Sequence, residues 1–227
     1  MRINYTQIKP QIDELLAVYS GLKEEANEKD SSIILSGKVR INRSYNNFTI
    51  DNEYELKILI TLNNDELPLV WDIGNHIDES YVHRYSDGEL CLETEAFIAL
   101  FFYNGYSLLQ WMENIVEPYY YSYEYYSRFG EFSYGDRGHD LDGVIETYQQ
   151  ILHESDIVKC VKLLRAISLR KYKGHLSCPC ESGLITRKCH GSYIYPFICD
   201  DYLFSIAERD YSRLCEVIKK YDKQSDH

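Results

Sequence analysis

Cys91 closes a short polar run that contains an Asp-Gly pair, His83-Arg84-Tyr85-Ser86-Asp87-Gly88-Glu89-Leu90-Cys91-Leu92. An Asp-Gly pair is typical of a tight turn, so this run predicts a turn that presents the Cys91 thiol at an exposed corner. A thiol in such a place can accept an acyl group and pass it to another molecule. The alternative is a buried Leu-Cys-Leu triplet whose cysteine only packs.

The acidic side chains near Cys91 indicate what kind of nucleophile it is. Glu89, Glu93 and Glu95 disfavour a thiolate electrostatically, which argues against a permanently activated, papain-like cysteine. Thioester exchange is nearly isoenergetic, so it depends on exposure and positioning more than on a depressed thiol pKa. The pattern therefore favours an acyl carrier over a hydrolase nucleophile.

A second group of reactive side chains lies near the C-terminus, where Cys178, Cys180, Cys189 and His190 form a C-x-C-x8-C-H pattern. Four such ligands can close a tetrahedral Zn²⁺ shell and leave no position for a catalytic water, so the pattern predicts one structural zinc ion. Metal binding would supply folding free energy to a short polar loop. Two alternatives stay open: the cysteines are free and buried, or flanking His175 or Cys199 replaces a ligand.

These four residues and their surroundings resemble the SEC-C motif, a zinc knuckle of the bacterial translocation ATPase and of many other bacterial proteins. The core of that motif reads CPCGSG, followed by basic residues and CC or CH, and the match covers the run from Cys178 to Gly191. The chain departs from it at Glu181, where the family usually has glycine. The resemblance implies that the knuckle binds partner proteins, whereas the spacing alone indicates only the metal.

The composition limits the possible partners and compartment. The net charge of −12 argues against a broad grip on nucleic acid, so we expect protein partners. No stretch is apolar for long enough to span a membrane, and the start MRINYTQIKP has no signal-peptide core. The odd count of 7 cysteines, with three close together, suits a metal site in a reducing compartment, so we expect a cytoplasmic protein. Cys160 and Cys215 fall on apolar helix faces and are expected to pack.

The 22 tyrosines of the chain are concentrated in the run Tyr119–Tyr126. A tyrosine cluster can form a recognition surface, because each ring supplies a large contact area at low entropic cost. It can also pack one ring face on the core while the hydroxyl reaches water. Both interpretations stay open.

The apolar periodicity predicts an α+β fold, with helices segregated from an antiparallel sheet. Strands are expected over 33–41, 54–60 and 69–73, with a hairpin connection over 42–47, and helices over 6–20, 108–116, 144–152, 157–167 and 203–221. The helix at 108–116 is expected to end or bend near Pro118. We expect a conjugating domain over 1–140 and a helical region over 141–227 that carries the knuckle at 174–191.

The expected order of helix, strands, proline-bearing loop and cysteine run resembles the ubiquitin-conjugating enzyme fold. More closely, it resembles the bacterial ubiquitin-conjugating-like (UBC-like) proteins of ubiquitin-like and CBASS antiphage operons. Gly88, Leu90, Cys91 and Leu92 match the G-x-[IL]-C-L signature of that family. Eukaryotic members have a His-Pro-Asn tripeptide where this chain has Tyr81-Val82-His83, and His83 stands eight residues before Cys91, as in the bacterial branch. The resemblance implies a supporting role for His83, either near the thiol or in bonding the loop.

The resemblance implies that Cys91 receives a protein C-terminus as a thioester from an activating enzyme and passes it to an amine of an acceptor protein. The carried protein would be a ubiquitin-like protein or, in CBASS-like operons, a cGAS-like nucleotidyltransferase. Two alternatives remain: an inactive adaptor built around the zinc knuckle, or a disulfide between Cys91 and a partner thiol. Asp136, Asp140 and Asp142 could orient an incoming lysine, although a solvated loop explains them more simply.

Overall fold

A computed structural model describes residues 4–25, 31–45, 47–133, 138, 140–170 and 172–225, with only the backbone course for Asp140 and residues 217–225. The fold is α+β, with an antiparallel sheet and several helices. Contacts divide the chain into a first unit, Met1–Glu93 with Asn104–Asp136, and a second unit, Thr94–Tyr103 with Arg137–His227. The predicted domains 1–140 and 141–227 differ from this division mainly in the segment 94–103.

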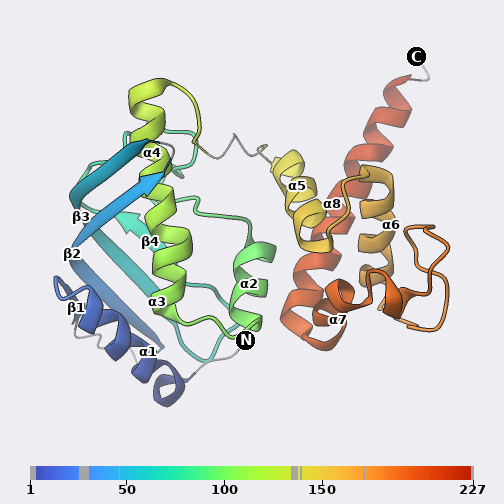
Figure 1. The fold of residues 1–227 in the computed structure, drawn as a ribbon, viewed down its shortest axis with the longest axis horizontal. Helices are drawn as coiled ribbons and strands as arrows, with labels where there is room; N and C mark the ends of the chain where they lie inside the picture. The colour runs from blue at the N-terminus through green and yellow to red at the C-terminus, as the bar shows by residue number, and fades with distance from the viewer. Residues whose placement is uncertain are drawn as a thin grey trace. The chain divides into compact units, whose positions relative to one another are not determined.

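The first unit contains an antiparallel sheet of four strands among the residues described. They are β1 (Leu22–Glu25), β2 (Ser32–Tyr45), β3 (Phe48–Thr61) and β4 (Leu69–Asp72), and each pairs with the next along the chain (Figure 1). In β2 and β3, apolar side chains alternate with exposed ones, as expected for a sheet with one buried face. The prediction of a connection over 42–47 was wrong, because Asn42 pairs with Asp51 and the ladder continues to Tyr45 and Phe48.

Helices cover the buried face of this sheet. Helix α1 (Tyr5–Val18) begins at the capping box formed by Asn4 and Gln7. Helix α3 (Leu108–Trp111), a π-helical turn η1 (Met112–Val116) and helix α4 (Glu117–Phe129) follow one another without a break, and α4 crosses β2 and β3 (Figure 1). The expected end or bend near Pro118 is instead the π turn, after which Pro118 lies in the first turn of α4, where its missing N–H is tolerated.

The tyrosine run forms most of α4 and packs inward at its start. Tyr119, Tyr120 and Tyr121 are buried. The Tyr121 hydroxyl donates to the Tyr45 carbonyl over 2.6 Å, and the Tyr120 ring lies 4.4 Å from that of Tyr54. For these three tyrosines the packing interpretation holds, and the remaining tyrosines of the run are half-buried.

The second unit is helical. It contains α2 (Glu95–Tyr103), α5 (Asp140–Leu152), α6 (Ile157–Ser168), a 3₁₀ turn η2 (Thr186–Lys188), α7 (Gly191–Cys199) and α8 (Asp201–Ser225). Helix α8 packs against α2, α6 and α7 (Figure 1). The helices predicted at 144–152, 157–167 and 203–221 lie within α5, α6 and α8. Within the described part of the chain, no helix is both long enough and apolar enough to cross a bilayer.

Candidate functional site

A tight turn precedes Cys91, at the place where the Asp-Gly pair predicts one. The N–H of Gly88 donates to the Tyr85 carbonyl over 3.0 Å, and the N–H of Tyr85 donates to the Glu89 carbonyl over 2.8 Å. Gly88 has φ +87°, a conformation that favours glycine. The Leu90 N–H then donates to the Val70 carbonyl over 2.8 Å, so strand β4 holds the cysteine segment in place.

The Cys91 thiol is half-buried, so the expectation of a fully exposed corner is met only in part. The Tyr85 hydroxyl donates to Sγ of Cys91 over 3.4 Å. Burial raises the pKa of the Cys91 thiol, the Tyr85 hydrogen bond lowers it, and the carboxylates of Glu93 and Glu89 raise it again. The thiol is therefore held mainly in its protonated form, as the acidic neighbours in the sequence predict.

His83 joins Cys91 through its main chain. Its carbonyl oxygen accepts hydrogen bonds from the Cys91 N–H at 2.8 Å and from the Tyr119 hydroxyl at 2.9 Å. Its imidazole ring lies edge-on to Tyr81 and Phe132, with centroids 5.6 Å and 5.4 Å away. These contacts favour the loop-bonding role among the two considered for His83.

Sequence reasoning did not single out Tyr85 as a site residue. The available signal was its position in the same turn as the cysteine, six residues before it. Of the acidic candidates for the acceptor step, Asp136 lies outside the described residues, whereas Asp140 and Asp142 lie in the first turn of α5.

Cys160 and Cys215, both expected to pack on apolar helix faces, differ in how far they are buried. Cys160 is buried on α6, and burial raises the pKa of its thiol to about 12, so the prediction of an inert core cysteine is confirmed. Cys215 on α8 is half-buried.

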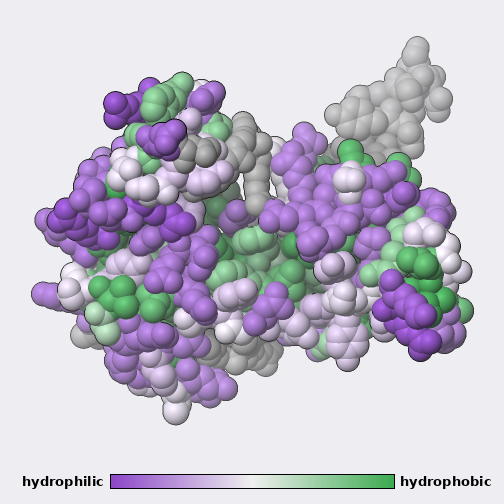
Figure 2. All heavy atoms as spheres, in the orientation of Figure 1, coloured by the Kyte–Doolittle hydropathy of each residue, from purple (hydrophilic) through white to green (hydrophobic). Residues whose placement is uncertain are grey.

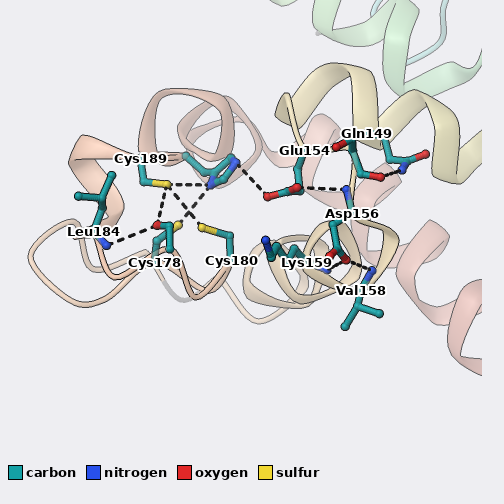
Figure 3. Close-up of polar contacts among 12 residues, drawn as sticks. Gln149, Glu154, Asp156, Val158, Lys159, Cys178, Cys180, Leu184 and Cys189 are labelled. Atoms are coloured by element: carbon teal, nitrogen blue, oxygen red, sulfur yellow. Dashed lines mark hydrogen bonds and ion pairs between the residues drawn. The ribbon is translucent and has the colours of Figure 1, made fainter.

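The four predicted metal ligands come together in the second unit. The ligand atoms of Cys178, Cys180, Cys189 and His190 all lie within 4.8 Å of one another. Nδ1 of His190 lies 3.4 Å from Sγ of Cys178 and 3.2 Å from Sγ of Cys189, and the sulfurs of Cys180 and Cys189 are 3.5 Å apart. A tetrahedral zinc shell with Zn–S bonds of about 2.3 Å puts neighbouring sulfurs roughly 3.8 Å apart. The group can therefore hold a metal ion, and its three sulfurs point toward one another in Figure 3.

A small hairpin positions the first two ligands. The Cys178 N–H donates to the Leu184 carbonyl over 2.8 Å, and Ser177 bridges to Ile185. Glu181 and Gly183 turn the chain with φ +60° and +80°. The turn η2 then leads to Cys189 and to His190, which precedes α7.

The alternative ligands do not belong to this group. His175 and Cys199 are exposed, and neither is among the side chains that converge in the described part of the chain. Figure 2 shows hydrophobic atoms on the surface over the hairpin, where Leu176 and Leu184 are each about half exposed.

The electrostatics of the group suit a cation. Burial raises the pKa of Cys178 to about 11, although backbone N–H groups of Cys180 and His190 oppose that shift. A divalent ion would offset the cost of burying thiolates. Burial also lowers the pKa of His190, which favours the neutral imidazole that ligation requires. The donor set and its environment therefore fit Zn²⁺.

Each unit thus contains one group of side chains that could react or bind an ion. The first unit has a half-buried thiol beside a tyrosine hydroxyl, and the second has four soft or borderline ligands able to enclose an ion. No protein-family model, curated protein or solved structure matches this chain.

Proposed function

We propose that this chain is a ubiquitin-conjugating-like acyl carrier that accepts a protein C-terminus as a thioester on Cys91 and transfers it to an amine. The observation that carries the proposal is the thiol itself, half-buried after a turn and held by Tyr85 and by the His83 main chain. Further support is the order of α1, the antiparallel strands β1–β4 and the segment of Cys91 within the first unit, which is the order expected of the UBC-like resemblance up to the cysteine.

The reaction needs two exchanges at one sulfur. The Cys91 thiolate attacks the thioester carbonyl of a protein C-terminus held on an activating enzyme, a new S–C bond forms, and the enzyme's cysteine leaves as a thiolate. An acceptor amine then attacks the Cys91 thioester, so that an amide forms, Cys91 leaves and the amine loses its proton to solvent. The Tyr85 hydroxyl, which donates to Sγ, stabilises the thiolate before the first step and after the second.

The partners follow from the same resemblance. They are an activating enzyme, an acceptor protein, and a carried protein that is either a ubiquitin-like protein or a cGAS-like nucleotidyltransferase. The biological setting is bacterial antiphage defence.

The knuckle completes the proposal. Cys178, Cys180, Cys189 and His190 would hold one Zn²⁺ ion, which supplies folding free energy and no catalytic water, because protein ligands take all four positions. The hairpin around the ion would recruit a partner protein through its exposed apolar side chains, among them Leu176 and Leu184.

The test is co-expression of the chain with the proteins encoded beside it, followed by gels with and without reductant. A thioester adduct should be cleaved by hydroxylamine and be absent in Cys91→Ala. In Cys91→Ser the same transfer would leave an oxygen ester that survives reductant, whereas a partner disulfide cannot form. No adduct on the wild-type chain, with the activating enzyme and its ATP present, would remove the carrier function.

One observation favours a second candidate, a non-catalytic adaptor built around the knuckle. Burial and the carboxylates of Glu93 and Glu89 raise the pKa of the Cys91 thiol, which lowers the thiolate fraction. An adaptor would bind its partner equally well with Cys91 or Cys91→Ala, and would lose binding when the metal ligands are replaced. The carrier loses its adduct with Cys91→Ala alone.

A further inference from the structure

We infer that Glu154 is a positioning residue of the metal centre, which it connects to the turn between α5 and α6. This inference rests on the proposed metal binding, and its test separates the two. Glu154 lies 36 residues before His190 in the chain, in the segment that follows α5. It belongs to neither the ligand pattern nor the hairpin.

The two nitrogens of the His190 ring face different groups, and one of them faces Glu154. Nδ1 faces the sulfurs of Cys178 and Cys189, so Nδ1 is the nitrogen placed to bind the ion. The other ring nitrogen, Nε2, lies 3.8 Å from Oε2 of Glu154. A metal on Nδ1 requires the ring proton on Nε2, where it points toward a carboxylate, the arrangement that commonly orients metal-bound histidines.

Burial strengthens this pair. The side chains of His190 and Glu154 are 10% and 14% exposed, so water screens their attraction less than it would at the surface. A distance of 3.8 Å is too long for a hydrogen bond. At this distance the Glu154 carboxylate attracts the N–H dipole at Nε2 of the neutral ring, which orients the ring once the ion is bound.

The carboxylate of Glu154 is itself held in place. Its Oε1 accepts the N–H of Asp156 over 3.1 Å, and the side chain of Asp156 caps α6 by accepting the N–H groups of Val158 and Lys159. The Glu154 N–H donates to the Gln149 carbonyl of α5 over 3.0 Å. Figure 3 shows Glu154 reaching toward the cysteines from the turn that also carries Asp156. A chain of contacts therefore runs from the N-terminus of α6 to a metal ligand.

A second ion pair provides a matched control. Nζ of Lys162 on α6 lies 2.8 Å from Oε2 of Glu181 in the hairpin, and these side chains are 40% and 68% exposed. This pair also joins α6 to the knuckle, but here the carboxylate pairs with a lysine and not with a metal ligand. The Lys162–Glu181 pair is shorter than the His190–Glu154 contact, but as an exposed pair it should contribute little. A larger effect of replacing Glu154 would therefore not be explained by a shorter distance.

The experiment measures Zn²⁺ affinity on the full chain by competition with a chromophoric chelator. Glu154→Ala should bind zinc about 10- to 100-fold more weakly than wild type, the usual effect of losing an outer-shell partner. Glu181→Ala should stay within about threefold. Glu154→Gln keeps the acceptor for the Asp156 N–H, and it is measured alongside in case the alanine variant does not fold.

Three outcomes decide the inference. With Co²⁺ as the probe, Glu154→Gln should shift the ligand-field absorption of the bound ion, which a purely structural role would leave in place. Wild-type zinc binding with unchanged affinity and spectrum in both Glu154 variants would overturn the role of Glu154 while leaving the metal site intact. A wild-type chain that takes up no zinc would overturn both.

Discussion

The Tyr85 hydroxyl donates a hydrogen bond to Sγ of Cys91 across 3.4 Å, and both residues belong to one tightly bonded loop. The contact opposes the effect of burial, because a donated hydrogen bond stabilises the charged thiolate. A carrier sulfur must serve as nucleophile in one exchange and as leaving group in the next. Burial keeps the pKa of the Cys91 thiol raised despite this hydrogen bond, so the sulfur is not a permanently formed thiolate, and the Tyr85 hydroxyl favours the thiolate that each exchange needs.

Replacing Tyr85 with Phe should raise the pKa of Cys91 further and slow its alkylation. A hydrogen bond of about 0.5–1.5 kcal/mol corresponds to roughly a two- to tenfold lower rate with iodoacetamide below the thiol pKa. The rate is measured against pH by mass mapping of the Cys91 peptide. Tyr5→Phe, at an exposed tyrosine of α1, is the matched control and should not change it. Equal rates for Tyr85→Phe and wild type would show that the hydroxyl has no influence on the sulfur.

The zinc site should be evident as mass and as stability. The native mass should exceed the denatured mass by one zinc ion, and Cys180→Ser should lose that ion. Ligation stabilises the folded chain by about 4 kcal/mol when free zinc is 1,000 times Kd, so chelation should lower the melting temperature markedly. Cys199→Ser is the control, because Cys199 is exposed and outside the ligand group. Equal native and denatured masses would remove the assignment.

Glu181 occupies the left-handed region, with φ +60°, a conformation that favours glycine. Relief of a strain of about 1 kcal/mol should outweigh or match the extra chain entropy of glycine. We therefore expect Glu181→Gly to be as stable as Glu181→Gln, or more stable by up to about 1 kcal/mol. Comparison with Glu181→Gln removes the contribution of the Lys162 ion pair. The measurement is denaturant unfolding with zinc bound. A glycine variant clearly less stable than Glu181→Gln would contradict the claim that the backbone at Glu181 is strained.

Asp210 on α8 should make the second unit less stable as pH rises. Burial raises the pKa of its carboxyl, while the Tyr148 hydroxyl, which donates to Oδ2 over 3.0 Å, opposes the shift. Because the folded pKa lies above the unfolded value, the stabilising contribution is complete below the unfolded pKa and is lost as pH rises through the folded pKa. Asp210→Asn should therefore match wild type near pH 3 and exceed it at pH 7 by on the order of 1 kcal/mol. Thermal unfolding of both proteins across this pH range measures how the difference in their stability changes. A difference that does not change with pH would rule out titration of Asp210.

Short-range patterns predicted much of this structure. Alternation in β2 and β3 and helical periodicity in α5, α6 and α8 depend only on neighbouring residues, so the α+β class could be predicted. The C-x-C-x8-C-H spacing likewise predicted which four side chains would converge, because a single hairpin and turn bring them together. The Asp-Gly turn before Cys91 has the same local origin.

Features that depend on tertiary packing could not be predicted in this way. Strand β1 buries only Leu22 and has no alternation to detect, and α2 is apolar on almost every side, so it has no helical stripe. Glu154 approaches His190 only because the turn after α5 packs on the knuckle.

The intact mass of an adduct on Cys91 tests the carrier function most directly. The wild-type chain is incubated with its activating enzyme, ATP and the carried protein, and then analysed without reductant. A thioester predicts the sum of the two chains minus one water, with the adduct on the Cys91 peptide and cleavable by hydroxylamine. An adduct at the sum minus two hydrogens, or one that persists in Cys91→Ala, would contradict acyl transfer through Cys91.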